Sequence, residues 1–217
     1  MARKRQPKTP LSRERVLDAA LALADEDGID ALSMRKLAQA LGVEAMSLYN
    51  HVENKEDIVA GILDLVGAEV DPPADDLDWK TALRRRAIDA HEAFARHPWA
   101  ARIWMSASKP SPDRFAHADA ILRRLREAGF PPDVVYDTFH VLEGYTLGYT
   151  LQQLEFPYDA AQLEQLAKRF LADFPADDYP DLAEHIRQHL EPHEAEAGSF
   201  EFGLDLILDG LDRLRVS

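Results

Sequence analysis

The chain has 217 residues, 46% of them hydrophobic and 29% charged, an ordinary composition for a globular protein and unlike a disordered or fibrous one. It contains no cysteine, which excludes disulfide scaffolds, cysteine-ligated metal sites and thiol catalysis. No apolar run approaches the roughly 18 residues that a membrane helix needs, and no signal-peptide pattern is present, so we expect a cytoplasmic protein.

The net charge of −14 is unevenly distributed along the chain. Residues 1–15 carry six basic side chains and one acidic side chain, whereas residues 58–217 carry 16 basic and 29 acidic ones. A basic arm at residues 1–12, in front of an acidic body, suits a protein that touches a polyanion at one end only. A short disordered tail is the alternative explanation of the arm.

Helical periodicity runs through the chain, and no segment shows the alternation with a period of two that is typical of a half-buried strand. The predicted helices lie at 12–27, 33–41, 45–51, 55–70, 78–97, 98–107, 113–128, 132–155, 159–173, 180–190 and 199–215. We therefore expect an all-α fold. Asp71-Pro72-Pro73 interrupts the pattern, and it predicts a boundary between a head at 13–70 and a larger helical body at 71–217.

Residues 33–51 have the spacing of a helix-turn-helix. Ser33 can cap the first helix, Ala38 is small where the two helices cross, and Gly42 can supply a left-handed turn. Leu48 faces inward on the second helix. The outward residues are then Ala45, Met46, Ser47, Tyr49, Asn50 and His51. Such a short helix can enter a DNA major groove, although a helix–glycine–helix is also a common αα-hairpin.

One set of residues stands at spacings that are specific to a known family: Ala38, Leu41-Gly42-Val43, Ser47-Leu48-Tyr49, His51 and Asn54-Lys55. With them, residues 13–63 resemble the DNA-binding head of the tetracycline-repressor (TetR) family of transcriptional regulators. Three segments of the body resemble the regulatory domain of the tetracycline-repressor branch: Lys109-Pro110, Leu125–Phe130 and Thr146–Leu151. The resemblance covers 11–155 and, more loosely, the last helix.

The resemblance implies that the head contacts DNA. The implied contact positions are Arg35, Ser47, Tyr49, His51 and Lys55, together with Ala45 and Met46 at the base-reading tip. Hydroxyl, guanidinium and ammonium groups suit contacts with phosphates and base edges. The tip differs from the tetracycline-repressor branch, which has glutamine and proline there. Because alanine and methionine cannot make bidentate contacts with adenine, we expect a different operator sequence.

The helix at 132–155 is apolar almost all round, so several of its sides must be buried. Gly144 and Gly148 stand four residues apart on it and allow another helix to come close. The last helix carries an apolar stripe made of Phe200, Leu204, Ile207, Leu208, Leu211 and Leu214. We expect both helices to form a homodimer interface, as the resemblance also implies. A core within one chain is the alternative.

We expect the body to enclose a largely apolar pocket for a small-molecule effector. The candidate ligand-binding residues are Phe94, Trp104, Met105, Ile121, Tyr136, Phe139, His140 and Gly144. No cofactor is expected. By the resemblance, Met105 and Gln152 stand where the tetracycline-repressor branch holds magnesium-binding residues. A thioether and an amide are poor ligands for Mg²⁺, so we expect no binding of a tetracycline–Mg²⁺ complex.

Two other classes of protein stay open. An enzyme is disfavoured because no GxSxG, P-loop, HExxH or dinucleotide motif is present. Asp137, His140 and Glu143 share one helix face, which resembles half of a metal site. His185 and His189 have the i, i+4 spacing of metal ligands, but exposed loop histidines explain them more simply. The second class is an adaptor of the same fold that has lost DNA binding.

We interpret the sequence as that of a homodimeric, ligand-responsive repressor that binds a palindromic operator. Half-sites one helical turn apart, about 34–36 Å, would fit such a dimer. The effector would favour a dimer arrangement whose two recognition helices no longer match the operator.

Overall fold

The computed structural model describes residues 10–106, 111–156, 160–188, 190 and 199–215. Eleven α-helices and one short 3-10 helix occupy these residues and none of them forms a strand, which confirms the expected all-α fold. Most of the basic arm, the Lys109-Pro110 pair and His189 lie outside the described residues.

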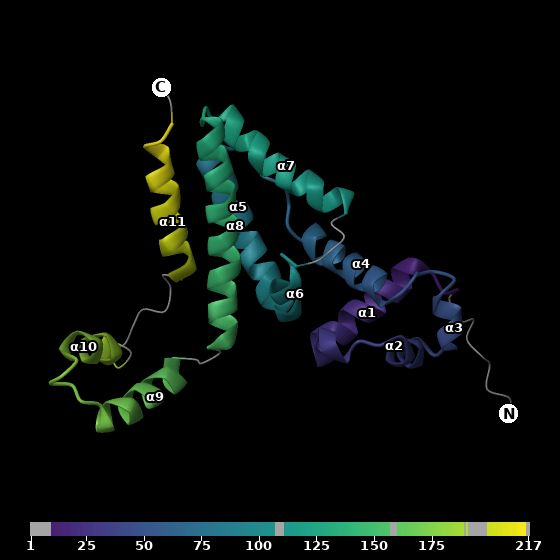
Figure 1. Ribbon diagram of the computed structural model, residues 1–217, viewed down its shortest axis with the longest axis horizontal. Coiled ribbons are helices and arrows are strands. Elements are labelled where there is room, and N and C mark those ends of the chain that lie inside the picture. Colours follow the sequence, from purple (N-terminus) through teal and green to yellow (C-terminus); the bar gives the residue numbers. More distant parts are fainter. Residues whose placement is uncertain (1–9, 107–110, 157–159, 189, 191–198, 216–217) are drawn as a thin grey trace.

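Four α-helices at one end of the molecule form the head (Figure 1): α1 (Arg13–Asp27), α2 (Met34–Leu41), α3 (Ala45–Leu48) and α4 (Lys55–Ala68). The side chains of Ser12, Ser33 and Asn54 accept hydrogen bonds from first-turn N–H groups and so begin α1, α2 and α4. Gly42 ends α2 in the left-handed region, at φ 67° and ψ 38°, where a residue with a Cβ is disfavoured. The expected cap at Ser33 and the expected turn at Gly42 are confirmed.

Two details of the head differ from the predicted helices. The helix expected at 45–51 ends at Leu48, because the N–H groups of His51 and Val52 both bond to the Leu48 carbonyl oxygen, at 2.8 and 3.0 Å, and form a turn. A 3-10 helix at Ile29–Ala31 lies in the connection between α1 and α2. It positions Leu32, which is buried in the head core.

The described part of the body contains seven helices: α5 (Trp79–Arg96), α6 (Pro98–Ile103), α7 (Pro112–Glu127), α8 (Pro132–Glu155), α9 (Ala160–Asp173), α10 (Pro180–Gln188) and α11 (Ser199–Asp212). The helices α5, α8 and α11 pack side by side, and α7 runs from one end of α8 toward α4 (Figure 1). The pair α9 and α10 pack on each other, apart from this bundle.

Two clusters of buried apolar side chains hold the chain together. One lies among the head helices and continues through α6 to Leu147 of α8. The other joins α5, α7, α8 and α11, and within it the rings of Trp79 and Phe130 pack edge to face at 4.9 Å between centroids. The head is therefore held on the body by packing rather than by a linker.

The apolar stripe predicted on the last helix faces its own chain, which corrects its assignment to a dimer interface. The buried members of the stripe are Phe200, Leu204, Leu208 and Leu211. Gly203 lets α11 approach α8, because a Cβ there would clash with the Tyr145 ring, and the Tyr145 hydroxyl donates to the Phe200 carbonyl oxygen at 2.7 Å. The remaining stripe member Leu214 lies after the end of α11 and is exposed, and a different face of α11 exposes Phe202 and Leu206.

Candidate functional site

The outward side of α3 carries strongly exposed side chains. Met46 is 75% exposed, and Tyr49, in the turn that follows, is 48% exposed. Ser47 and Ala45 are half-buried, and Ala45 packs against the head core. Residues three apart share a helix face, so burial of Leu48 also turns Ala45 inward. The outward position predicted for Ala45 is therefore only partly correct.

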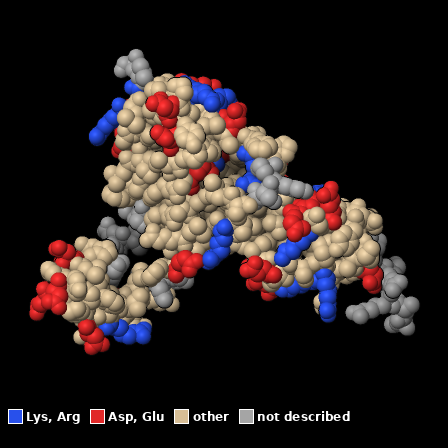
Figure 2. All heavy atoms as spheres, in the orientation of Figure 1, with Lys and Arg blue, Asp and Glu red and all other residues tan. Residues whose placement is uncertain are grey.

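The other predicted DNA-contacting residues lie on the neighbouring elements. Arg35 is exposed near the start of α2, His51 is half-buried in the turn after α3, and Lys55 is half-buried in the first turn of α4. Figure 1 places α3 at the outer end of the head, away from α11. Figure 2 shows basic and acidic side chains next to one another on the head, including its lower edge, and mainly acidic ones on the α9–α10 pair, with a basic group on its lower side.

A bidentate ion pair fixes the turn that follows α3. Arg13 of α1 donates to both carboxylate oxygens of Asp57, each at 2.8 Å, and also to the carbonyl oxygen of His51 at 3.3 Å. Asp57 accepts a further bond from the Glu53 N–H at 2.9 Å. The hydrogen bonds to Asp57 raise the pKa of Arg13. The charge of Arg13 therefore serves the fold of the head.

A polar cluster around the buried His97 joins the head to the body. His97, at the end of α5, places Nδ1 2.8 Å from an Asp25 oxygen of α1 and Nε2 2.9 Å from a Glu69 oxygen after α4. Trp99 donates its indole N–H to Asp25 at 2.7 Å, and Arg96 donates to Glu69 at 2.7 Å. Burial would raise the pKa of Glu69, but the bonds from Arg96 and His97 outweigh it and hold that pKa below its ordinary value. We call these five residues the junction cluster.

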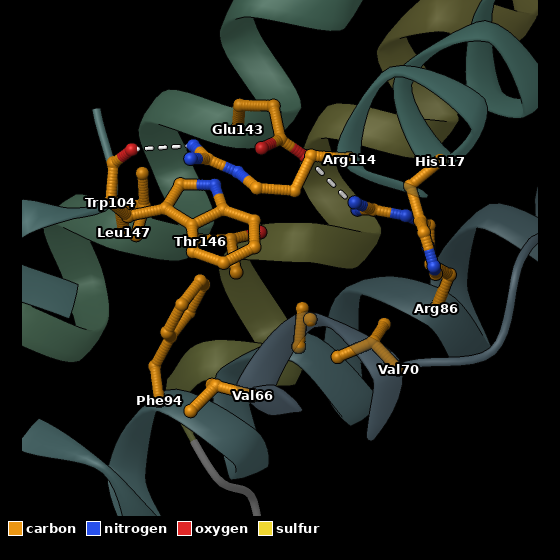
Figure 3. Close-up of a pocket in the computed structure, with 12 residues that line it drawn as sticks. Val66, Val70, Arg86, Phe94, Trp104, Arg114, His117, Glu143, Thr146 and Leu147 are labelled. Atoms are coloured by element: carbon orange, nitrogen blue, oxygen red, sulfur yellow. Dashed lines mark hydrogen bonds and ion pairs between the residues drawn. The ribbon is translucent and has the colours of Figure 1, made fainter. Parts of the chain in front are cut away.

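A cavity lies among α4, α5, α7 and α8. A narrow inner part of about 30 Å³, with room for one or two waters, adjoins a wider outer part of about 380 Å³. The outer volume falls in the range of small-molecule sites. Figure 3 shows Val66, Val70 and Phe94 on one side of the inner part, and charged side chains on the opposite side. We call the two parts together the body pocket.

The charged side of the body pocket holds two arginines. Arg86 of α5 forms an ion pair with Glu143 of α8 at 3.0 Å (Figure 3). Arg114 of α7 donates to the Trp104 carbonyl oxygen at 2.7 Å and lies over the indole ring, 4.4 Å from its centroid. Among the described residues, Arg86 Nε and Arg114 Nη1 are buried without a hydrogen-bond partner. Burial lowers the pKa of Arg114 and of the nearby His117, but the guanidinium stays charged.

Seven of the eight predicted ligand-binding residues line the body pocket: Phe94, Trp104, Met105, Ile121, Phe139, His140 and Gly144. Tyr136 does not. It is 63% exposed and packs beside His140, with 4.4 Å between ring centroids. The buried side of this turn of α8 is occupied by its neighbour Val135, which points Tyr136 outward.

The two arginines of the pocket were not among the predicted site residues, although the sequence carries a signal for them. Arg86 lies between the buried Leu83 and Ala90 on one face of α5, and Arg114 lies seven residues before the buried Ile121 of α7. A charged side chain within an apolar helix stripe needs a buried partner or a cavity. The junction cluster gave no such signal, because Asp25 and Trp99 are 74 positions apart.

Within the described part of the chain, no group of three or more His, Cys, Asp or Glu residues could hold a metal ion. His140 and Glu143 both line the outer part of the body pocket, but Glu143 is paired with Arg86 and Asp137 is exposed outside the lining. No helix among the described residues is long and apolar enough to cross a membrane.

Residues 16–62 match the family described as "Bacterial regulatory proteins, tetR family", and residues 71–215 match "Tetracyclin repressor-like, C-terminal domain". The chain is 31% identical to the HTH-type transcriptional repressor DrrR1 of Streptomyces coeruleorubidus, over 97% of this chain and 80% of that protein. It is 32% identical to tetracycline repressor protein class D of Escherichia coli, over 93% and 89%. Apo ActR of Streptomyces coelicolor has a TM-score of 0.77 and 27% identity, covering 94% and 96%, and ActR is also known in complex with actinorhodin.

Proposed function

The chain belongs to the TetR family of bacterial transcriptional regulators, and we propose that it is a homodimeric repressor that a small molecule releases from a palindromic operator. The position of α4 carries the proposal. Lys55 in its first turn lies in the head, and Val66 and Gly67 near its end line the body pocket. Its 14 residues span about 21 Å. A ligand that displaces the pocket end of α4 therefore tilts the head.

We assign three parts to the chain: a basic arm at 1–12, a DNA-binding head at 13–70, and a ligand-binding and dimerisation body at 71–217. The matches to 16–62 and 71–215 support this division. A regulator of this kind acts on DNA in the cytoplasm.

The proposed DNA-contacting residues are Arg35, Ala45, Met46, Ser47, Tyr49, His51 and Lys55. The exposed Met46 suits an apolar contact with a thymine methyl group. Lys55 adds its charge to the free N–H groups that begin α4, which suits a phosphate. The half-buried Ala45 leaves space for the groove to approach α3 closely.

Open apolar faces on α8 and α11 support the homodimer. Gly144 and Gly148 of α8 are exposed, and a Cβ at either position would meet no atom of the described residues within 4 Å. Phe202 and Leu206 of α11 are 65% and 59% exposed. A two-fold axis would bury both faces of both chains in one four-helix interface, which the alternative of an intrachain core leaves in water.

The body pocket is the proposed effector site, with Phe94, Trp104, Met105, Ile121, Phe139, His140 and Gly144 as ligand contacts. Its walls are largely apolar, which favours a largely apolar effector. Met105 and the exposed Gln152 still disfavour a tetracycline–Mg²⁺ complex as that effector. The named relatives are repressors, and ActR binds a small molecule.

Selection of bound sequences from random DNA duplexes by the full-length chain tests the proposal. We expect one palindromic consensus, two protomers per duplex, and a loss of affinity with salt of about one logarithmic unit per phosphate contacted. A monomer in solution, or indifference to every duplex at low ionic strength, would refute the proposal and favour the adaptor alternative.

A further inference from the structure

The residues that line the body pocket include two arginines and one carboxylate, that of Glu143. Arg86 and Glu143 pair at 3.0 Å and neutralise each other. Arg114 has no ion pair among the described residues, and its contacts are the Trp104 carbonyl oxygen and ring. Asp64 of α4 attracts Arg114, but it is not among the residues that line the body pocket, and its buried Oδ1 has no hydrogen-bond partner among the described residues.

Two buried N–H groups in the pocket lack acceptors. Arg86 uses Nη1 on Glu143 and Arg114 uses Nη2 on Trp104, while Arg86 Nε and Arg114 Nη1 have no partner among the described residues. Both arginines line the inner and the outer part of the body pocket. A buried charged donor is costly to leave unpaired, so an acceptor bound in the pocket gains from this arrangement.

The rest of the pocket excludes a purely ionic ligand. The outer part is walled by rings and aliphatic side chains, among them Phe115, Phe139 and Ile121, and it has a volume of about 380 Å³. A phosphate monoester would bring close to two negative charges to a pocket whose lining holds only one more arginine than carboxylate. A carboxylate brings one charge and accepts two N–H groups at once.

We propose that the body pocket selects organic carboxylates with an apolar ring system, which bind their carboxylate to Arg114 and their rings in the outer part. The inference rests on the proposed function and narrows its effector from a largely apolar molecule to an apolar monoanion. Trp104 holds the Arg114 guanidinium in place before the ligand arrives, so little ordering is lost on binding. Arg86 supplies a second donor.

Two probes with the same rings and different charge test this selection. Anthracene-9-carboxylate and anthracene-9-carboxamide are titrated separately into the full-length protein, and binding is followed by probe fluorescence at neutral pH. We expect the acid to bind at least about tenfold more tightly than the amide, the usual gain of a charge-assisted hydrogen bond.

Three variants test whether Arg114 is responsible for the preference for the carboxylate. Arg114→Gln should weaken the acid to the level of the amide and leave the amide unchanged, which also reports an intact pocket. Arg114→Lys keeps the charge and should retain part of the preference, so it tests the proposal even if the glutamine variant folds poorly. Arg126→Gln removes an exposed arginine from the same helix and should behave as the unaltered protein.

Equal affinity for acid and amide, no saturable binding of the acid below about 1 mM, or an unchanged preference in Arg114→Gln would each overturn the proposal. The titration contains no DNA, so its outcome is separate from that of the duplex selection. Acid preference in a chain that ignores every duplex would leave this inference standing and remove the proposed repressor. Operator binding without a preference for the acid would support the proposed repressor and overturn this inference.

Discussion

The junction cluster and the charged side of the body pocket use similar side chains in opposite ways. In the junction cluster, each ring nitrogen of His97 lies within 2.9 Å of a carboxylate oxygen, and Asp25 and Glu69 receive further donors. In the pocket, Arg86 and Arg114 each keep one buried N–H without an acceptor among the described residues. A satisfied cluster stabilises one arrangement of the chain, whereas an unsatisfied one is stabilised by the ligand that completes it.

The end of α4 lies between these two clusters. Glu69, the residue after α4, belongs to the junction cluster, and Val66 and Gly67 line the body pocket. In the proposed function, the junction cluster holds the head on the body, while the contact between α4 and the body pocket responds to a ligand. This difference suits a ligand-driven switch, because ligand binding can shift α4 only if another contact keeps the head attached to the body.

The largest effect on stability should come from disrupting the junction cluster, whose hydrogen-bonding groups are paired. We expect His97→Ala to lower the free energy of unfolding by about 3 kcal/mol, because the buried imidazole ring is lost and Asp25 and Glu69 both lose their contact with it. Urea denaturation measures the change. The control His140→Ala, at an exposed position of α8, should change stability little. Equal effects of the two substitutions would show that the junction cluster does not hold the head.

A third surface, the open face of α8, is incomplete in one chain and should be completed by a second copy. We expect Gly148→Leu to weaken the dimer by about 2 kcal/mol or more, because the added side chain separates the two helices. Within one chain the substitution has open space and gains helix propensity, so helix content should not fall. Sedimentation equilibrium and circular dichroism measure both. A dimer of unchanged affinity would place the interface elsewhere.

Two lysines of the head test the assignment of the phosphate contacts. We expect Lys55→Ala to weaken binding to every duplex by about tenfold and to reduce the salt slope by about one. Lys36→Ala should have a smaller effect, because Lys36 is already paired with Asp27 at 2.6 Å. Fluorescence anisotropy against specific and scrambled duplexes measures both variants. A larger loss in Lys36→Ala would reverse the assignment.

The same assay tests the base-reading tip. Substitution of Met46 should change which duplex is preferred, since we propose that this exposed, uncharged side chain contacts base edges. Loss of affinity that is uniform across sequences would instead assign Met46 to the DNA backbone or to the fold.

The smallest effect should come from the titration of His117. Burial lowers the pKa of His117, so the folded chain binds this proton less readily than the unfolded chain. The resulting loss of stability is absent above the ordinary histidine pKa of about 6.5 and grows as the pH falls below it. His117→Gln should therefore lose less stability between pH 7 and pH 5 than the unaltered protein. His91, whose pKa is also lowered by burial, retains part of the loss.

Local features of the fold were predictable from the sequence, and distant contacts were not. The bounds of α8 agree with the predicted helix at 132–155, because a proline begins the helix and the apolar run fixes its length. The Ser33 cap and the Gly42 turn are likewise local. Periodicity correctly predicted an apolar stripe on α11, but it does not say whether the same chain or a second copy packs on that stripe.

The same distinction between local features and distant contacts applies to the candidate sites. The exposed Met46 and Tyr49 follow from helix geometry around Leu48, and the apolar pocket wall follows from large side chains on the body helices. The charges of the pocket depend on which helices face one another. Arg86 and Glu143 are 57 positions apart, and only the packing of α5 on α8 brings them together.

The distance between the two heads of the dimer tests the central claim most directly. The chain has no cysteine, so Glu26→Cys at an exposed position of α1 accepts one spin label per protomer. We predict one narrow distance by pulsed electron paramagnetic resonance when the protein is bound to its operator, and a shifted distance when a compound that releases the operator is bound. The same distance in both states, or no dipolar coupling between labels, would contradict a ligand-driven change in the spacing of the recognition helices.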